Sequence, residues 1–251
     1  MNRMGQHESS VVAVIPARWG STRFPGKALA EIAGSPMIAH VIRRASEAET
    51  VDHVLVATDD ERIADAAQAA GAEPVMTGAC PSGTDRVAEA VADRDQWQIV
   101  VNIQGDEPLL SGANIDVLVR GLLEDPEVGM ATLCRPLEPE RVEDPNAVKV
   151  VRDQKGLAMY FSRSPIPHPR DEAAAATMWR LHLGIYGFRL ETLRRFVAQP
   201  PSPLEQAEKL EQLRALENGI DILVLDAPHP AFGVDTPEDL ERVETIMRAR
   251  A

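Results

Sequence analysis

The chain has 251 residues, a length that fits one large α/β domain or one domain with a sizeable insertion. Its formal net charge of −13 argues against a nucleic-acid-binding protein, because phosphate backbones require a basic surface. No apolar run approaches the roughly 20 residues of a membrane-spanning helix, so we expect no membrane partner.

Two further features concern the cellular compartment. Residues 1–10 are polar, which predicts a flexible N-terminus without a secretory signal. Cys80 and Cys134 each stand alone among small or apolar neighbours and form no CxxC pair, so neither a disulfide framework nor a zinc site is expected. We therefore predict a cytoplasmic protein.

Strand-like and helix-like segments alternate through the first half of the chain. Apolar or β-branched runs predict strands within residues 11–15, 53–60, 73–77 and 98–108. Helices are predicted from Ser35-Pro36, from Asp59 as the cap of a helix that stops at Gly71, and over residues 84–93 and 111–125. Because the strands are continuously apolar and the connections short, we expect a mostly parallel sheet covered on both faces.

The pattern changes after Gly129. Strand-like runs without helices between them occupy residues 130–136, 147–153 and 157–163, and residues 180–190 predict a returning strand. Residues 164–177 are rich in Pro and Ala and predict an exposed loop. The sequence therefore predicts one three-layer α/β domain with a mixed sheet and a β-rich insertion over about residues 130–200.

Regular elements resume towards the C-terminus. Helices are predicted over residues 191–199, 202–219 and 236–250, with a strand over residues 220–226. The second of these helices begins with Ser202 as its cap, proline at the first position and Glu205 completing a capping box.

The stretch "RWGSTRFPGK", residues 18–27, directly follows the first predicted strand. Ligands of open parallel sheets bind beyond the carboxyl ends of the strands, where this stretch should lie. It concentrates Arg18, Arg23 and Lys27 in a strongly acidic chain, and its two glycines allow a close backbone approach. It is neither a Walker A nor a GxGxxG motif. An anion site and a solvated surface loop are both compatible with these residues.

Two aspartates follow other predicted β segments at the same edge. Asp106 ends "VVNIQGDEP", and Asp235 stands in "FGVDTPEDLERV". Exposed carboxylates there suit magnesium, which prefers one or two carboxylates together with substrate phosphate oxygens. A turn or helix-cap role explains either aspartate equally well at this stage.

Several motifs resemble the 3-deoxy-manno-octulosonate (Kdo) cytidylyltransferases, which belong to the sugar nucleotidyltransferase superfamily. The resemblance runs from about Val11 to Arg248 and includes "IPARWGSTRFPGKALAEIAG", "SGTDRVAEA", "VVNIQGDEPLL" and "GVDTPEDLERV". "LHLGIYGF" together with "PLEQAEKLEQLR" points to the Kdo enzymes in particular. The chain departs from the pattern at Trp19-Gly20 and at Ala28, but the charged positions are intact.

The resemblance implies a Rossmann-like nucleotidyltransferase fold and the reaction of CTP with Kdo to give CMP-Kdo and diphosphate, for lipopolysaccharide biosynthesis. Arg18, Lys27 and Asp106 would be catalytic, and Asp106 and Asp235 would hold Mg2+. The implied nucleotide residues are Pro16, Ala17, Arg18, Ser21, Lys27, Thr77, Ser82, Gly83, Arg86 and Gln104. The resemblance also implies a homodimer formed through the insertion.

The sugar acid has one carboxylate and many hydroxyls. Arg163 is the candidate partner of the carboxylate, since a guanidinium matches a carboxylate bidentately. Candidates for the hydroxyls are Gln104, His182, Tyr186, Glu211 and Gln212. His182 and Tyr186 share strand parity and should lie on one face, although packing within a strand would explain them too.

Two other functions remain open from the sequence. The chain would fit a cytidylyltransferase that acts on another sugar acid, such as a nine-carbon sialic-type acid. A nucleotide-sensing module without catalysis is the other alternative, and retention of both cations and both aspartates argues against it. The residues identify no general base and do not give the number of metal ions.

Overall fold

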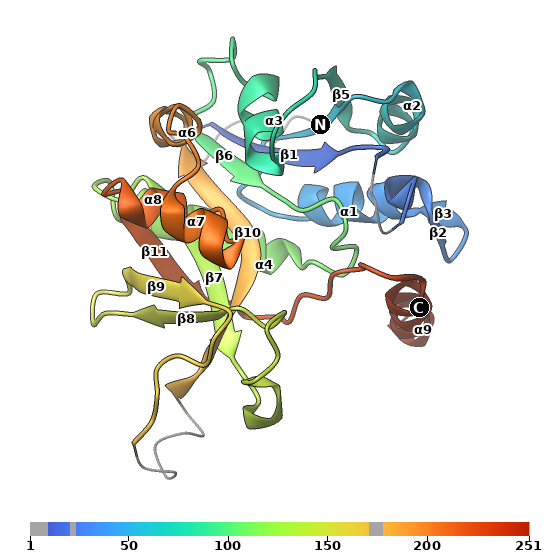
Figure 1. Ribbon diagram of the computed structural model, residues 1–251. Helices are drawn as coiled ribbons and strands as arrows, with labels where there is room; N and C mark the ends of the chain where they lie inside the picture. Colours follow the sequence, from blue (N-terminus) through green and yellow to red (C-terminus); the bar gives the residue numbers. More distant parts are fainter. Residues whose placement is uncertain (1–9, 21–23, 171–177, 251) are drawn as a thin grey trace.

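The computed structural model describes residues 10–20, 24–170 and 178–250. Within them, one mixed sheet has the strand order β11-β7-β10-β6-β1-β4-β5, with helices on both faces (Figure 1). This confirms the predicted three-layer α/β architecture. Residues 1–9 of the predicted flexible N-terminus, the candidate Ser21 and Arg23, and residues 171–177 of the predicted loop lie outside the described residues.

The four predicted strands of the first half form the parallel part of the sheet. They are β1 (Val11–Ala17), β4 (His53–Thr58), β5 (Glu73–Met76) and β6 (Ile99–Asn102). β1 lies between β4 and β6 and is parallel to both. Val11, Ala13 and Ile15 pack into one core cluster and Val12 and Val14 into another, so β1 is buried on both faces.

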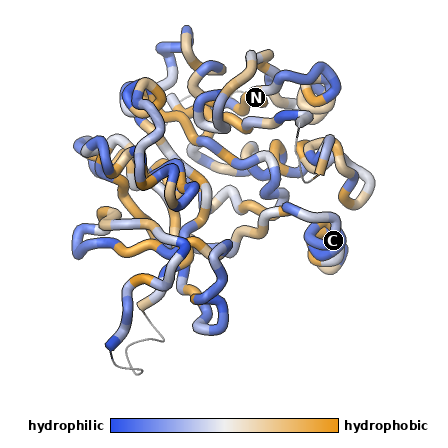
Figure 2. Tube along the Cα trace, in the orientation of Figure 1, coloured by the Kyte–Doolittle hydropathy of each residue, from blue (hydrophilic) through white to orange (hydrophobic). Residues whose placement is uncertain are grey.

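Helices cover both faces of this sheet. The first core cluster contains residues of α1 (Met37–Ser46), α2 (Glu61–Ala69) and α4 (Gly112–Glu124). The second contains residues of α3 (Gly83–Ala90), α6 (Leu190–Val197) and α8 (Leu213–Glu217). Figure 2 shows hydrophilic stretches gathering on the outer turns and helix surfaces. The burial pattern agrees with amphipathic helices around an apolar sheet.

Two predicted helix caps are wrong by one residue each. Ser35 and Pro36 form β3 (Ser35–Pro36), which pairs with β2 (Glu31–Ile32) across Gly34, and α1 starts only at Met37. Asp60 caps α2, because its carboxylate accepts a hydrogen bond from Arg62 N at 3.0 Å. Asp59, the predicted cap, instead forms an ion pair with Arg86.

The β-rich second half is confirmed, and it extends the main sheet. β10 (Arg180–Arg189) runs antiparallel between β6 and β7 (Met130–Pro136), and β11 (Ile222–Asp226) is parallel to β7. A hairpin of β8 (Lys149–Arg152) and β9 (Ala158–Ser162) joins β10 through β8. The short helix η2 (Pro139–Arg141) lies between β7 and β8.

The single helix predicted over residues 202–219 is wrong, because the chain forms two helices. α7 (Pro203–Glu208) has the predicted capping box of Ser202 and Glu205, but Lys209 adopts the left-handed conformation with φ of 54° and ends it. α8 then starts at Leu213. The break allows buried Leu210 to enter the core while Glu211 reaches towards α3.

The C-terminal helix α9 (Pro237–Arg250) closes the chain beside β2 and β3 (Figure 1). Val243 of α9 and Val234 before it form a small third core cluster with Ile32, Met37 and Leu109. This packing fixes the segment that carries Asp235. None of the helices within the described residues has the length and apolar character needed to cross a membrane.

Candidate functional site

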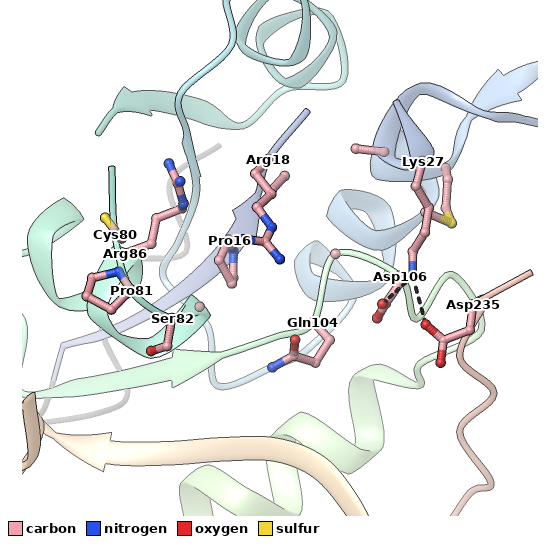
Figure 3. A pocket seen from close by; sticks show the side chains of 15 residues that line it. Pro16, Arg18, Lys27, Cys80, Pro81, Ser82, Arg86, Gln104, Asp106 and Asp235 are labelled. Carbon is pink, nitrogen blue, oxygen red and sulfur yellow. Dashed lines mark hydrogen bonds and ion pairs between the residues drawn. The ribbon is translucent and has the colours of Figure 1, made fainter. Parts of the chain in front are cut away.

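A cavity of about 280 Å3 lies beyond the carboxyl ends of β1 and β6 (Figure 3). This is the edge at which open α/β sheets bind ligands. Ten of the residues predicted for the site line it: Pro16, Ala17, Arg18, Lys27, Ser82, Gly83, Arg86, Gln104, Asp106 and Asp235. Segments from four distant parts of the chain therefore meet in one polar pocket.

The loop after β1 is held by an aromatic contact. Gly26 N donates to Trp19 O at 3.1 Å, and Gly26 has a φ of 70°, just before the short helix η1 (Lys27–Leu29). The Arg62 guanidinium lies 3.3 Å above the centre of the Trp19 ring, and Asp60 holds that guanidinium through two side-chain hydrogen bonds. The start of α2 thus positions the loop that presents Lys27.

Gly26→Ala should impair use of the nucleotide that the sequence motifs imply. The new Cβ would lie 2.9 Å from the Trp19 ring, and a left-handed alanine costs about 1–2 kcal/mol. We expect about a 10-fold fall in kcat/KM for the nucleotide, measured by steady-state kinetics. Gly20→Ala is the matched control, because its Cβ would meet nothing within 4 Å. Equal kinetics for the two variants would mean that the Gly26 conformation does not position Lys27.

Lys27 lies between the two predicted metal ligands. Its Nζ is 2.6 Å from Asp106 Oδ2 and 3.3 Å from Asp235 Oδ1. Val234 N also donates to Asp106 O at 2.9 Å, which ties the segment before α9 to the turn after β6. The fold therefore brings the three side chains together although they are far apart in the sequence.

The donor set fits a magnesium ion. Two carboxylates at a pocket edge suit Mg2+, which takes few protein ligands and completes its octahedron with water and substrate phosphate oxygens. The Lys27 ammonium already stands as a cation between them. Within the described residues no group of three or more His, Cys, Asp or Glu side chains could hold a metal, and Asp106 and Asp235 remain the pair that the sequence predicts.

The opposite wall of the pocket is the start of α3. Ser82 caps this helix by accepting from Asp85 N, and Arg86 projects from its first turn. Arg86 donates to Asp59 Oδ2 at 2.7 Å and to the Thr77 hydroxyl. Thr77 thus does not line the cavity. Together with Asp59, which the sequence predicted to be a helix cap, Thr77 positions Arg86.

Sequence reasoning also missed several lining residues, namely Ala28, Met37, Cys80, Pro81 and Gly105. Cys80 lies beside Glu89, with 3.0 Å between Sγ and Oε2. Burial and this contact raise the pKa of the Cys80 thiol to about 11, so it remains protonated at neutral pH and is a poor nucleophile. No residue pattern distinguished these positions from ordinary core and turn residues.

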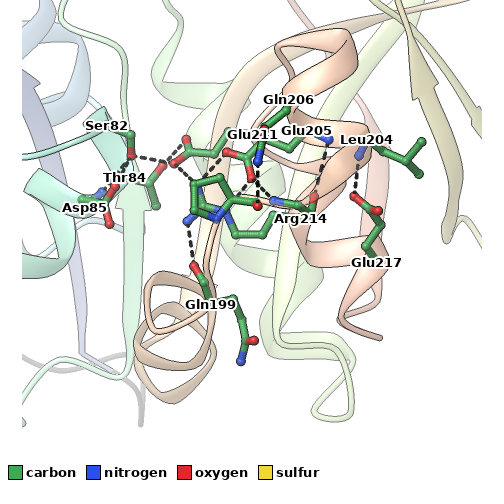
Figure 4. A network of polar contacts seen from close by, with 12 residues as sticks. Ser82, Thr84, Asp85, Gln199, Leu204, Glu205, Gln206, Glu211, Arg214 and Glu217 are labelled. Atoms are coloured by element: carbon green, nitrogen blue, oxygen red, sulfur yellow. Dashed lines mark hydrogen bonds and ion pairs between the residues drawn. The ribbon is translucent and has the colours of Figure 1, made fainter.

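Glu211, in the segment between α7 and α8, contacts this wall (Figure 4). Its carboxylate accepts from Ser82 Oγ at 2.6 Å and from Thr84 Oγ1 at 2.8 Å. The Ser82 hydroxyl also lies 2.7 Å from Asp85 Oδ2, and with one proton it donates to only one carboxylate at a time. Burial raises the pKa of Glu211. A residue predicted to bind the sugar, Glu211, therefore contacts a residue predicted to bind the nucleotide, Ser82.

More buried polar groups surround this contact. Asn102 donates to Thr84 Oγ1 at 3.1 Å, while Asn102 Oδ1 and Gln212 Nε2 are buried without a hydrogen-bond partner among the described residues. Such orphaned groups are costly unless a ligand or water satisfies them. Arg214 anchors the same region through a bidentate ion pair with Glu205, at 2.6 and 2.8 Å (Figure 4).

His182 and Tyr186 lie on one face of β10, as the spacing predicts. Their ring centroids are 5.5 Å apart, and Tyr186 pairs in register with Asn102 of β6. Burial lowers the pKa of His182 to about 3, and burial together with the Glu211 carboxylate raises the pKa of Tyr186 well above its usual value. Both side chains are therefore neutral at physiological pH and can act as hydrogen-bonding groups.

Arg163 is placed differently from the expectation. Its guanidinium donates to the carbonyl oxygens of Glu208 at 2.7 Å, Pro145 at 2.8 Å and Lys209 at 3.3 Å. Arg163 does not line the cavity. Carbonyl oxygens take three of its five N–H donors, so a substrate carboxylate would have to bind the remaining donors or displace a carbonyl oxygen.

Comparisons with known proteins identify the family of the chain. The chain matches the Cytidylyltransferase family over residues 12–222. It is 53% identical over 240 residues to 3-deoxy-manno-octulosonate cytidylyltransferase of Anaeromyxobacter sp. (strain Fw109-5), covering 95% of this chain and 97% of the relative. The protein of the same name from Myxococcus xanthus (strain DK1622) is 52% identical over 240 residues, with the same two coverages of 95% and 97%.

Solved structures give the same result. The structure of CMP:2-keto-3-deoxy-manno-octonic acid synthetase complexed with CTP superimposes with a TM-score of 0.92 and 42% identity, covering 97% of this chain and 100% of that one. A cytidylyltransferase from Leptospira borgpetersenii, 19% identical with a TM-score of 0.64, shares the fold; 96% of this chain and 88% of that one are covered.

The chain belongs to the cytidylyltransferase family. Within this family it is similar, along nearly its whole length, to the 3-deoxy-manno-octulosonate cytidylyltransferases. The resemblance of the sequence motifs is thereby confirmed.

Proposed function

We propose that the protein transfers the cytidylyl group of CTP to Kdo, giving CMP-Kdo and diphosphate for lipopolysaccharide biosynthesis. The relatives at about 50% identity carry the name of this activity, and the structural relative is a complex with CTP. The observation that carries the proposal is the cavity itself, which gathers cations and carboxylates at the ligand-binding edge of the sheet.

The reaction is an in-line substitution at phosphorus. The anomeric hydroxyl oxygen of Kdo forms a bond to the α-phosphorus of CTP, and the bond from that phosphorus to the bridging oxygen breaks. The hydroxyl proton is lost and diphosphate leaves with the bonding electrons. Because positioning and charge neutralisation account for most of such catalysis, Arg18 and Lys27 would act by binding the triphosphate.

Asp106 and Asp235 would hold Mg2+ beside the α-phosphate. When bound, this ion supplies Lewis-acid charge stabilisation at the phosphoryl oxygens. The remaining nucleotide contacts would come from the end of β1 and the loop after it, from the N-terminal end of α3 and from the turn after β6. The residues are Pro16, Ala17, Ser21, Ser82, Gly83, Arg86 and Gln104, with Thr77 supporting Arg86. We assign no general base.

The sugar acid would bind between the pocket and the insertion. The polar groups around Glu211 support this location, because buried Asn102 and Gln212 each present an unsatisfied atom there. Gln104, His182, Tyr186, Glu211 and Gln212 are the candidates for its hydroxyls. Arg163 remains the candidate partner of the Kdo carboxylate, through N–H donors that are unoccupied or that substrate binding frees from carbonyl oxygens.

Tyr186→Phe and Glu211→Gln should raise the KM for Kdo by about 10-fold or more while changing the KM for CTP little. A site built to hydrogen-bond a substrate hydroxyl loses more when a partner is removed than an apolar site does when a methylene changes. Steady-state kinetics with each substrate varied in turn measures this. Because Glu211 contacts Ser82, Tyr186→Phe is the cleaner of the two variants.

The contrary results are equally clear. If both Michaelis constants rise together, or neither changes, these residues are structural and the sugar site lies elsewhere. The control is Tyr160→Phe, which removes the other phenol of the chain, on β9. Neither tyrosine lines the cavity, but Tyr186 is the one that contacts His182 and pairs with Asn102. It should leave both constants unchanged.

A diphosphate-release assay with CTP and a panel of sugar acids tests the proposed reaction. Release with Kdo but not with sialic-type acids supports it. Release with another sugar acid would keep the cytidylyltransferase and change the substrate, and no release with any acid would favour a nucleotide-sensing module.

We further propose that the enzyme works as a homodimer in the cytoplasm. The chain would act as a single domain, with about residues 130–200 as the insertion that supplies the dimer contact. Met159, on β9 of that insertion, is a large hydrophobic residue with an exposed fraction of 66%, so a charge introduced there would disturb such a contact without entering the core. Sedimentation of the wild type and of Met159→Glu would test it.

A further inference from the structure

The two proposed metal ligands already share a cation in this structure. Lys27 Nζ is 2.6 Å from Asp106 Oδ2 and 3.3 Å from Asp235 Oδ1 (Figure 3). The Lys27 side chain is only 14% exposed, so its ammonium points inward between the carboxylates. A divalent ion bound by both carboxylates would need the same space.

We propose that Lys27 holds the place of the divalent cation in the nucleotide-free enzyme and moves to the triphosphate when nucleotide and metal bind. The proposal rests on the proposed function of this site and assigns Lys27 two successive partners. Lysine suits such an exchange, because its ammonium is a point charge on a flexible four-carbon stem and makes no fixed bidentate pair. An arginine at this position would hold the carboxylates more rigidly.

Electrostatic repulsion explains why the Lys27 ammonium is useful between the two carboxylates before a metal ion binds. Two carboxylates held close together repel one another, and a cation between them keeps the pocket assembled. The ammonium and a divalent cation also repel each other when they share ligands. Lys27 therefore opposes metal binding to the empty pocket, and a triphosphate relieves this opposition because it offers the ammonium a new anionic partner.

The consequence is positive coupling between nucleotide and metal. The coupling is reciprocal, so metal should bind more tightly with nucleotide present and nucleotide more tightly with metal present. Removing Lys27 should weaken this coupling. It should also strengthen metal binding to the nucleotide-free protein, although the same change is expected to lower activity.

The test measures Mn2+ binding to the full chain without nucleotide or sugar, by the electron paramagnetic resonance signal of free Mn2+ at low salt. Lys27→Ala and Lys27→Gln should each bind Mn2+ about 3- to 30-fold more tightly than the wild type, the range that the loss of two partly exposed ion pairs implies. The matched control is Lys155→Ala, which removes the same charge from an exposed turn between β8 and β9. It should bind Mn2+ as the wild type does.

A second measurement, the melting temperature with and without Mn2+, distinguishes a change in metal binding from a loss of folding. Mn2+ at a fixed concentration should raise the melting temperature of Lys27→Ala more than that of the wild type. The reason is that a ligand of the folded state, at free concentration c, stabilises it by RT ln(1 + c/Kd), which is larger for tighter binding. Wild-type-like or weaker Mn2+ binding by both folded Lys27 variants would overturn the proposal. Because no sugar is present, this outcome is independent of whether Kdo is the substrate.

Discussion

Lys27→Ala is expected to lower kcat/KM by about 100-fold or more, a loss typical of removing one preorganised charge donor from a transition state. Lys27 is the one lysine that lines the described pocket, and its ammonium lies at the edge where the triphosphate would bind. Charge that develops on the leaving diphosphate would lose this partner. Initial rates with CTP and Kdo, each varied at saturation of the other, measure the effect.

The fold should survive this change. The carboxylates that pair with Lys27 are 32% and 54% exposed, and such ion pairs contribute about 1 kcal/mol or less. A melting curve close to that of the wild type would therefore accompany the loss of activity. Near-normal turnover by Lys27→Ala would indicate that the loop after β1 is a solvated surface loop and not an anion site.

Asp106→Asn should abolish most of the activity, by about 100-fold or more, and raise the Mg2+ concentration needed for half-maximal rate. The substitution keeps the size of the side chain and removes the charge that a hard cation requires. Asp235→Asn should act in the same direction if both carboxylates share the ion. A Mg2+ titration of the initial rate for each variant checks this.

Glu107→Gln is the control for the neighbouring carboxyl group. Residues 104–107 form a turn, in which Glu107 N donates to Gln104 O, and not the extended segment that the sequence suggested. Burial and the Asp106 carboxylate raise the pKa of Glu107 to about 8, so that it is mainly protonated at pH 7 and a poor metal ligand. If Asp106→Asn and wild type share one Mg2+ dependence, the metal assignment fails.

That Arg18, Lys27 and Asp106 lie at one edge of the sheet could be predicted from the sequence. Arg18 and Asp106 come just after apolar runs, Lys27 lies in the same loop as Arg18, and parallel strands bring such positions to one edge. Strand parity likewise placed His182 and Tyr186 on one face of β10. These predictions depend only on local periodicity and on the direction of the strands.

Contacts between residues far apart in the sequence could not be predicted from it. The helical pattern of residues 202–219 continues through Lys209, whose left-handed conformation is unfavourable for lysine in isolation and is held by tertiary packing. The break moves Glu211 against Ser82 and Thr84. Similarly, nothing local distinguishes Asp60 from Asp59 as a helix cap, because the choice depends on the ion pair between Asp59 and Arg86.

The central place of β10 has a consequence for how the chain folds. β10 hydrogen-bonds to β6 on one side and to β7 on the other, so the strand that carries Tyr186 also completes the sheet of the nucleotide half. Without it, the four-residue strand β6 would have an unpaired edge, and unpaired edges can associate with other chains. The N-terminal and C-terminal halves of the sheet therefore form one folding unit. Movement between the proposed nucleotide and sugar sites has to arise in turns and helices, not from a hinge in the sheet.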